Sequence, residues 1–307
     1  MTPSTTARAL RTDDDWWRIR EFILDMYPIT PTGFVWENRR WEGWRFHRER
    51  PVPVRRLREV IRIWESSDRI VGVAHPEGRG DVHLQVHPGF RILESDMFAW
   101  AEDRLSLPDE GDRTRSITTF AFEYDSLRQR VLTDRGWTRL ESGGMTRRLR
   151  LGGQPLRPTP NIDGYALRST RGNERNVAQR MADVINAGFN TDIHSATEIH
   201  TFMTKSPSFS HDLNLIAEAS DGSFSAHVGG TYDEQNRRGI VEPVCTDPHH
   251  RRRGLAQALI LELFHRFERL GATDVLVDTG DDGTANRFYE SAGFTEAYHG
   301  NVWRKDW

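Results

Sequence analysis

The chain has 307 residues, of which 36% are hydrophobic and 28% charged, and its formal net charge is −3. That apolar content can fill sizeable cores, which excludes a largely disordered chain, and no stretch approaches the roughly eighteen consecutive apolar residues that span a membrane. The single cysteine, Cys245, excludes internal disulfides and multi-cysteine metal clusters. Neither half has the strong basic excess of a nucleic-acid binder, and the first residues lack an apolar signal core. We therefore expect a cytoplasmic protein without nucleic-acid or membrane partners.

Strand-like runs and helical spacings of apolar residues alternate from the amino terminus onward. Residues 151–161, LGGQPLRPTPN, gather glycine and proline without apolar periodicity, which is typical of a linker. We therefore expect one domain at residues 1–150 and a second at residues 162–307. In the first, helical spacing occurs near residues 13–27, 92–105 and 126–133, and strand-like runs occur near 58–64, 70–75, 81–86 and 116–122, before terminal strands.

The second half shows the same order of elements. A dipeptide ending in proline at 87–88 recurs at 247–248, and a glycine-aromatic dipeptide at 136–137 recurs at 293–294. The near-constant offsets predict two copies of one α/β fold, each with a mixed sheet flanked by helices. Strand-like runs lie near residues 165–169, 214–219, 223–232, 239–246 and 273–279, helical spacing lies near 177–189, 196–205, 255–270 and 284–291, and two short strands follow.

The most informative stretch is residues 241–256, VEPVCTDPHHRRRGLA, where a strand, a proline turn and a helix follow one another. Gly254 and Ala256 carry almost no side chain, so a ligand can approach the backbone closely there. Free N–H groups at the start of the helix, with the helix dipole behind them, favour an anion. The arginine run 251–253 alone is typical of a solvated basic turn. The small residues placed directly after a strand instead favour a phosphate site.

The pattern Arg251-x-x-Gly254-x-Ala256 resembles the acetyl-CoA loop of the GNAT acetyltransferases, Gln/Arg-x-x-Gly-x-Gly/Ala. Downstream, residues 288–294, FYESAGF, resemble the closing Tyr-x-x-x-Gly-Phe motif of that family. The resemblance covers about residues 163–306 and implies a mostly antiparallel sheet with two splayed central strands. The asparagine that the family usually has seven positions before the tyrosine is Asp282 here. Asn286 lies nearer and is expected to take over its contact.

The resemblance also implies that the pantetheine arm of acetyl-CoA pairs with the splayed strand. Pro243 fits such a strand, because proline removes a hydrogen-bond donor from a sheet. A plain bulge near a sheet edge is the alternative interpretation of Pro243. The residues expected to bind acetyl-CoA are Val244, Cys245, Thr246, Arg251, Arg252, Arg253, Gly254, Leu255, Ala256 and Asn286.

Acetyl transfer to an amine needs a base for the amine, a donor to the oxyanion and a proton for the departing thiolate. Glu242 is the predicted base, acting through a water. It alternates with apolar Ile240 and Val244, and burial among them would raise its pKa. An equally favoured interpretation of Glu242 is a structural one, in which it forms an ion pair with an arginine. The resemblance implies that Tyr289 is the general acid and that the Val244 N–H donates to the oxyanion. The other interpretation of Tyr289 is an aromatic residue packed in the core.

The first copy lacks the residues that the second offers for this chemistry. The alignment puts Glu94 in the place of Gly254 and Asp96 in the place of Ala256, so negative charge would meet a pyrophosphate. Val82 replaces Glu242 and Leu132 replaces Tyr289. We therefore predict that residues 1–150 keep the fold and bind no acetyl-CoA. Their aromatic segment, residues 34–46, is interpreted either as an acceptor-binding wall or as helix packing between the domains.

The sequence thus predicts an acetyl-CoA-dependent N-acetyltransferase that acts on a small-molecule amine from a site in the second domain. A protein or peptide N-acetyltransferase and a non-catalytic acyl-CoA sensor are the alternatives. No metal is expected, because His249 and His250 are adjacent and His83 and His87 lack a third ligand. A monomer or homodimer is expected. No motif identifies the acceptor.

Overall fold

The computed structural model describes residues 4–108, 115–172 and 174–307, apart from the side chains at positions 174 and 175. The chain forms two compact units. The first unit comprises Met1–Glu37, Val52–Thr146 and Tyr298–Trp307, and the second comprises Asn38–Pro51 and Arg147–Ala297. Within the described residues, no helix is both long enough and apolar enough to cross a bilayer.

Two segments belong to the other unit than predicted, and residues 147–161, predicted as the end of the first domain and a linker, lie in the second unit. Residues 38–51 belong to the second unit, because Glu42 there accepts hydrogen bonds from the Ser206 hydroxyl (2.5 Å) and the Ser208 amide (2.9 Å). Residues 298–307 belong to the first unit, because residues 300–306 pair with a strand of that unit. Both exchanges depend on contacts between residues far apart in the sequence.

The first unit is built on a sheet in the order β1-β2-β3-β4-β6-β13. Its neighbours are antiparallel except β4 and β6, which pair in parallel at Asp81–Thr118 and Val82–Thr119. The strands are β1 (Thr6–Ala9), β2 (Arg62–Ser66), β3 (Arg69–His75), β4 (Asp81–Val86), β5 (Leu107–Pro108), β6 (Arg115–Phe122), β7 (Thr138–Arg150) and β13 (Glu296–Asp306). The helices are α1 (Asp13–Met26), η1 (Tyr27–Ile29), α3 (Val54–Leu57), η2 (Pro88–Leu93), α4 (Glu94–Arg104) and α5 (Ser126–Asp134).

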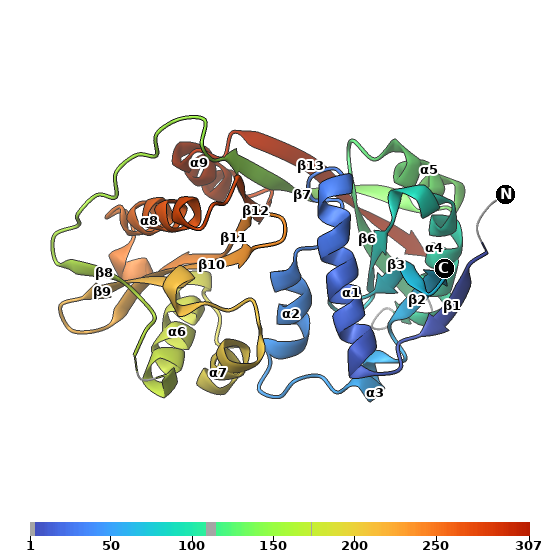
Figure 1. The fold of residues 1–307 in the computed structure, drawn as a ribbon, viewed down its shortest axis with the longest axis horizontal. Helices are drawn as coiled ribbons and strands as arrows, with labels where there is room; N and C mark the ends of the chain where they lie inside the picture. Colours follow the sequence, from blue (N-terminus) through green and yellow to red (C-terminus); the bar gives the residue numbers. More distant parts are fainter. Residues whose placement is uncertain (1–3, 109–114, 173) are drawn as a thin grey trace. The chain divides into compact units, whose positions relative to one another are not determined.

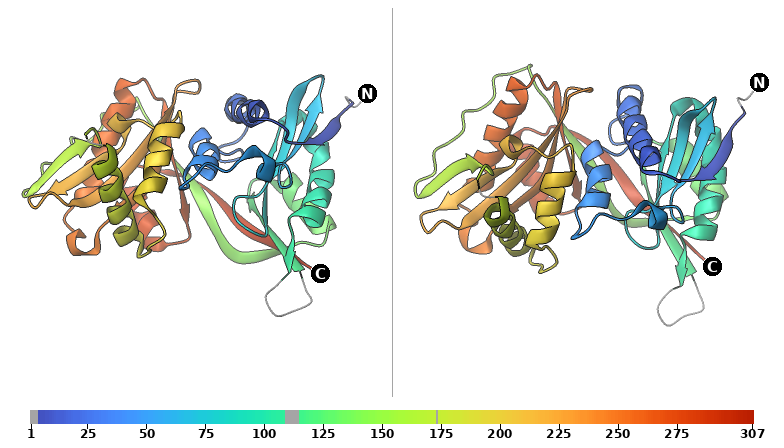
Figure 2. Two further views of the ribbon diagram at one scale, coloured as in Figure 1. Left: turned by 90° about the horizontal axis from the view of Figure 1, so that it is seen from below. Right: turned by 60° about the horizontal axis from the view of Figure 1, so that its bottom comes forward.

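The second unit has the strand order β8-β9-β10-β11-β12, antiparallel up to β11 and parallel between β11 and β12. Helix α8 covers one face of its sheet and helices α6 and α7 cover the other (Figures 1 and 2). The strands are β8 (Tyr165–Ser169), β9 (Leu215–Ala219), β10 (Phe224–Asp233), β11 (Arg238–Thr246) and β12 (Asp274–Gly280). The helices are α2 (Asn38–Phe46), α6 (Glu174–Phe189), α7 (Ala196–Lys205), η3 (His211–Leu213), η4 (Pro248–His250), α8 (Leu255–Arg269) and α9 (Gly283–Ala292).

Two apolar clusters hold the second unit together. Leu259, Leu263 and Phe267 of α8 pack on Val228 and Val241 of the sheet, all of them buried. The opposite cluster joins α6 and α7 to the other face of β9, β10 and β11. The helical spacing of these side chains makes one stripe of α8 apolar, which is why the helix lies along the sheet.

The predicted repeat is confirmed by the order of the elements. Apart from the two-residue strand β5, the series β3-β4-η2-α4-β6-α5-β7 of the first unit recurs as β10-β11-η4-α8-β12-α9-β13. The α/β fold with mixed sheets is likewise confirmed. The two short strands predicted at the end of the second copy are wrong, because β13 is a single long strand, and the terminal strands predicted for the first copy are likewise one strand, β7. Residues 151–161 contain no helix or strand, but they lie within the second unit, and Leu151 and Leu156 pack against its core.

Candidate active site

Strand β11 separates from β12 halfway along its length. Their parallel register covers only residues 238–240 of β11, whose last pair is Ile240 and Leu276. On its other side β11 stays paired with β10 as far as Thr246, although a bulge interrupts the register opposite Glu242 and Pro243. Both interpretations of Pro243 are therefore present, because the bulge faces β10 and the split faces β12. The split leaves one edge of residues 241–246 open.

The hydrogen bonds between β11 and β10 show which amides of β11 face this open edge. The Asp247 amide donates to the Ser225 carbonyl on the β10 side at 2.9 Å. Because N–H groups alternate in direction along a strand, the Cys245 amide also faces β10. The amides of Val244 and Thr246 face the side of β12. The Cys245 amide is therefore not available at the open edge, whereas the amides of Val244 and Thr246 are.

The thiol of Cys245 is 5% exposed, and burial raises its pKa to about 12. At neutral pH it is a protonated packing group. This agrees with the interpretation of a lone cysteine as part of the core.

The turn between β11 and α8 creates an uncapped helix start. Gly254 has φ +79°, ψ 6° and precedes α8 without any side-chain cap. Such a left-handed conformation favours glycine. The first N–H groups of this 15-residue helix therefore lack a side-chain acceptor. Arg252 also has a positive φ, of 63°. The sequence predicts only that Gly254 lets a ligand approach the backbone, and the left-handed conformation is a further reason for glycine here.

The three arginines of the turn differ in their contacts. Arg251 donates to the carbonyls of Gly188 (2.8 Å) and Thr246 (3.3 Å), so it braces the turn. This use was not expected, because the sequence treated all three arginines alike. Arg252 and Arg253 are exposed and form no ion pair within the described residues. These two guanidinium groups can therefore meet an anion at the start of α8.

Asn286 is occupied by contacts within the protein. It is buried, and its oxygen accepts from Arg147 Nε at 2.8 Å. Its amide nitrogen donates to the carbonyls of Gly280 and Asp282, both at 2.9 Å. These bonds hold the turn between β12 and α9 and do not support the predicted contact of Asn286 with a cofactor. The sequence also missed Arg147, which further binds the Phe294 carbonyl at 3.2 Å.

Tyr289 is a core aromatic, and its role as general acid stays a prediction. Its side chain lies in the core between α8 and α9, with its ring centroid 5.7 Å from that of Phe294. No hydrogen bond of its hydroxyl occurs within the described residues. Burial, and then the negative charge of Glu242, raise its pKa to about 12. The phenol is thus protonated at neutral pH and near enough to Glu242 to be influenced by its charge.

Glu242 is more exposed than the sequence predicted. Its side chain is 48% exposed, and its Oε2 lies 2.8 Å from Nη1 of Arg39 on α2. The predicted burial is therefore wrong. The bulge beside Pro243 breaks the alternation of faces on which that prediction depended. The alternative, a partner of an arginine, is what the structure shows, and the sequence did not single out Arg39.

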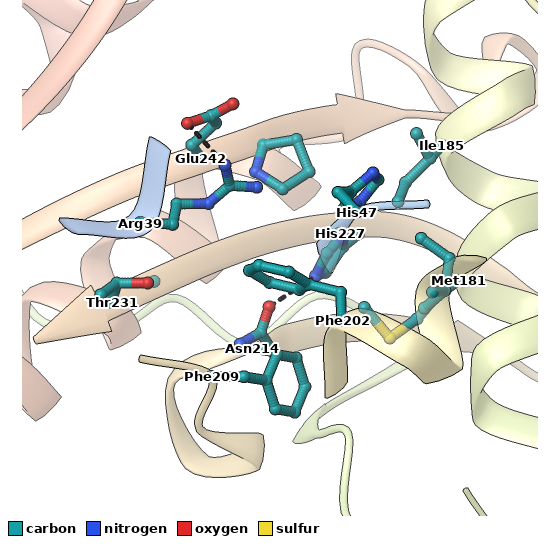
Figure 3. A pocket seen from close by; sticks show the side chains of 13 residues that line it. Arg39, His47, Met181, Ile185, Phe202, Phe209, Asn214, His227, Thr231 and Glu242 are labelled. Carbon is teal, nitrogen blue, oxygen red and sulfur yellow. Dashed lines mark hydrogen bonds and ion pairs between the residues drawn. The ribbon is translucent and has the colours of Figure 1, made fainter. Parts of the chain in front are cut away.

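A small cavity lies beside Glu242 (Figure 3). Its enclosed part offers about 20 Å³, which is room for about one water molecule. Apolar, aromatic and polar side chains all line it. The lining residues are Arg39, His47, Met181, Ile185, Ile199, Phe202, Phe209, Asn214, His227, Gly230, Thr231, Glu242 and Pro243.

His227 is the most buried polar residue of this cavity. It is 1% exposed, and burial together with the charge of Arg39 lowers its pKa to about 3, so it is neutral. Its Nε2 lies 3.3 Å from the oxygen of Asn214, whose amide nitrogen donates to Ser210. Nε2 therefore carries the proton and Nδ1 a lone pair. Within the described residues Nδ1 has no hydrogen-bond partner.

Comparison with known proteins finds a family match for part of the second unit. Residues 188–294 match the model of the acetyltransferase (GNAT) family. These residues are a GNAT acetyltransferase domain. A comparison of the sequence with curated proteins gives no match. The matched range includes β11, the turn, α8 and α9, which are the elements that carry the features described above.

Solved structures extend the likeness to the whole chain. A GCN5-related N-acetyltransferase from Sphaerobacter thermophilus is 20% identical, with a TM-score of 0.66 and coverage of 100% of this chain and 97% of that one. A tandem GNAT protein from the clavulanic acid biosynthesis pathway is 15% identical, with a TM-score of 0.64 and coverage of 99% and 98%. A GNAT acetyltransferase from Colwellia psychrerythraea is 11% identical, with a TM-score of 0.60 and coverage of 98% and 100%. At these identities the likeness shows the fold.

Near the cavity of the GNAT domain, His47, His194 and Glu198 form a cluster whose potential metal-ligand atoms lie within 4.8 Å of one another. Both histidines contact the same oxygen of Glu198, His194 at 3.3 Å. Burial alone would raise the pKa of Glu198. The hydrogen bond and charge of His47, with the charge of His194, outweigh burial and lower it. The sequence missed this cluster, and the absence of a metal stays a prediction.

The corresponding position of the first unit is filled by its own side chains. Glu94, which replaces the glycine of the GNAT turn, is fully buried at the start of α4. It lies 2.7 Å from Arg91 Nε and 3.1 Å from Arg128 Nε, and Arg91 also contacts Asp125 at 2.7 Å. Arg91 aligns with Arg251. A buried ion-pair network thus stands where the second unit has an open helix start.

Proposed function

We propose that the protein is an acetyl-CoA-dependent N-acetyltransferase with one working site, in the second unit, and that its acceptor is a small-molecule amine. The GNAT match supports acyl transfer from an acyl-CoA. The observation that carries the rest is the open edge of β11, which has an uncapped helix start at one end and Glu242 at the other. A carrier with phosphates at one end and a thioester at the other would fit this arrangement, with its phosphates at the helix start and its thioester near Glu242.

The binding part of the proposal uses backbone groups and two arginines. The pyrophosphate of acetyl-CoA would lie at the start of α8, where the N–H groups, Gly254 and the small side chain of Ala256 leave the backbone accessible. Arg252 and Arg253 would add charge-assisted hydrogen bonds. The pantetheine arm would pair with the amides of Val244 and Thr246 along the open edge of β11.

The chemical part assigns each proton a place. The ammonium group of the acceptor first releases one proton to solvent, and the neutral amine nitrogen bonds to the thioester carbonyl carbon while the Val244 N–H donates to the developing oxyanion. Glu242 takes the second proton from this nitrogen as the bond forms, directly or through one water in the cavity. When the carbon–sulfur bond breaks, the Tyr289 hydroxyl donates its proton to sulfur. The proton held by Glu242 then restores the phenol, so the products are an amide and free CoA.

The same proposal makes the first unit a domain without acetyl-CoA. Glu94 would place a carboxylate at the start of α4, where a pyrophosphate would otherwise bind, and its two arginine partners are occupied by it. Val82 and Leu132 are fully buried and supply neither a base nor an acid. The first unit then contributes structure only.

Release of thiol from acetyl-CoA in the presence of a panel of amines tests this function. We expect turnover with at least one small amine, and Glu242→Gln should remove it while calorimetry still shows acetyl-CoA binding. Peptide amines acetylated in preference to small amines would instead support a protein acetyltransferase. Tight binding of acetyl-CoA without turnover of any amine would support an acyl-CoA sensor. No binding at all would refute the proposal.

A further inference from the structure

Arg39 is a buried cation whose hydrogen-bonding capacity is only partly used. Its side chain is 10% exposed, and Nη1 lies 2.8 Å from Glu242. The guanidinium carbon lies 5.4 Å from the centre of the Phe202 ring. Within the described residues the protein offers no acceptor to its Nε and Nη2. A guanidinium carries five N–H donors, and a buried one ordinarily uses them on acceptors.

These unused donors lie at the cavity where the acceptor amine must arrive. Arg39, Glu242 and His227 all line that cavity (Figure 3). One buried atom there, Nδ1 of His227 with its lone pair, has no hydrogen-bond partner within the described chain. Two unpaired polar groups of opposite hydrogen-bonding character, one donor and one acceptor, indicate a ligand that carries both an acceptor and a donor.

The charges of Arg39 and Glu242 further restrict the class of acceptor. An acceptor that brings only an ammonium group to Glu242 would be repelled by the guanidinium that already lies against the same carboxylate. An acceptor that also carries a carboxylate would compensate this repulsion. Because Nη1 is used by Glu242, the edge formed by Nε and Nη2 remains for two parallel N–H···O bonds, the arrangement in which arginine binds carboxylates best.

We propose that the acceptor is a small zwitterion of the α-amino acid class, with its amine at Glu242 and its carboxylate on the Nε–Nη2 edge of Arg39. This inference depends on the proposed function. The enclosed space of about 20 Å³ is too small for the whole molecule. The head group would therefore lie at the mouth beside the half-exposed Glu242, and a small apolar side group would face Phe202 and Ile185.

The experiment compares acceptors matched in shape but not in charge. Each small L-amino acid is assayed beside its carboxamide and the corresponding amine without a carboxyl group, and kcat/KM is measured for thiol release from acetyl-CoA. We expect the wild-type protein to prefer the acid over the amide by at least about tenfold, the usual effect of a charge-assisted pair. Arg39→Gln should bring this ratio close to one by raising KM for the acid.

Two further variants control for structure. Arg40→Gln removes a neighbouring charge on α2 that does not line the cavity, and it should keep the preference for the acid. Arg39→Lys keeps the charge but not the forked geometry, so it should keep only part of the preference. If Arg39→Gln does not fold, as judged by circular dichroism, the Lys variant provides the test.

The outcomes separate this inference from the proposed function. Acetylation of amides and simple amines as readily as acids would overturn the inference and leave the acetyltransferase intact. A preference for acids that survives Arg39→Gln would also overturn it, because Arg39 would then be only a positioning residue for α2. Binding of acetyl-CoA without acetylation of any amine would overturn both.

Discussion

Replacing Gly254 by asparagine or aspartate separates backbone strain from charge at the start of α8. A non-glycine residue at φ +79° costs about 1–2 kcal/mol in general, and less for asparagine and aspartate. An added Cβ would meet Ile162 Cδ1 at 3.6 Å, an ordinary contact. Both variants should therefore fold, with a melting temperature lowered by about 2–4 °C for each kcal/mol lost.

The two side chains have nearly the same shape, so their difference in acetyl-CoA affinity reports charge alone. A carboxylate about 5–6 Å from a phosphate charge, at an effective dielectric constant of about 20, costs roughly 3 kcal/mol. That corresponds to about 100-fold weaker binding for Gly254→Asp than for Gly254→Asn. The Asp substitution also imitates the first unit, where Glu94 occupies this position.

Isothermal titration calorimetry with acetyl-CoA measures both variants, and a second titration at high salt supplies the control. Because salt screens exposed charges, the gap between Asp and Asn should narrow at 1 M salt, where the screening length is about 3 Å. Equal affinities of the two variants at low salt would refute the reasoning, because the pyrophosphate would then lie elsewhere.

Four further predictions concern catalysis and stability. Glu242→Gln should lower kcat by about 10²–10⁴-fold at an unchanged acetyl-CoA Kd, and an unchanged kcat would exclude Glu242 as the base. Tyr289→Phe should keep the melting temperature, because the ring supplies the packing, and lower kcat by at least about tenfold. Since the Tyr289 pKa is raised to about 12, the wild-type rate should show no loss assignable to this phenol up to about pH 10, and such a loss would contradict the assignment. The pKa of Glu198 is lowered in the folded protein, so its pairing with the histidines stabilises the fold at pH values above the ordinary glutamate pKa. This contribution is lost as the pH falls through the pKa of Glu198 in the folded protein. Glu198→Gln should therefore cost about 1 kcal/mol in urea unfolding at pH 6–7 and little in strong acid, and an equal cost at both would contradict the linkage.

The fold could be predicted largely from local patterns. Helical spacing and alternation located the helices and strands around the site, and the repeated turns at His87 and Asp247 aligned the two units. Both side chains accept from the amide two residues later, His87 from Gly89 and Asp247 from His249. Turns held by hydrogen bonds between residues close in the sequence can be predicted from the sequence.

What could not be predicted depends on distant contacts. The sequence assigned residues 38–51 to the first domain, because nothing in the local pattern shows that Glu42 accepts hydrogen bonds from residues more than 160 positions away. Asn286 read as a ligand contact, because its partner Arg147 lies 139 residues earlier. Glu242 read as buried because alternation was assumed to continue through the bulge beside Pro243. Arg39, the residue that faces it, carries no motif.

A crystal structure of the full chain with acetyl-CoA tests the central claim most directly. The account predicts one acetyl-CoA per chain, with its pyrophosphate at the start of α8 beside Arg252 and Arg253 and its pantetheine arm along Val244 and Thr246. Acetyl-CoA bound at α4 of the first unit, or away from the open edge of β11, would contradict it.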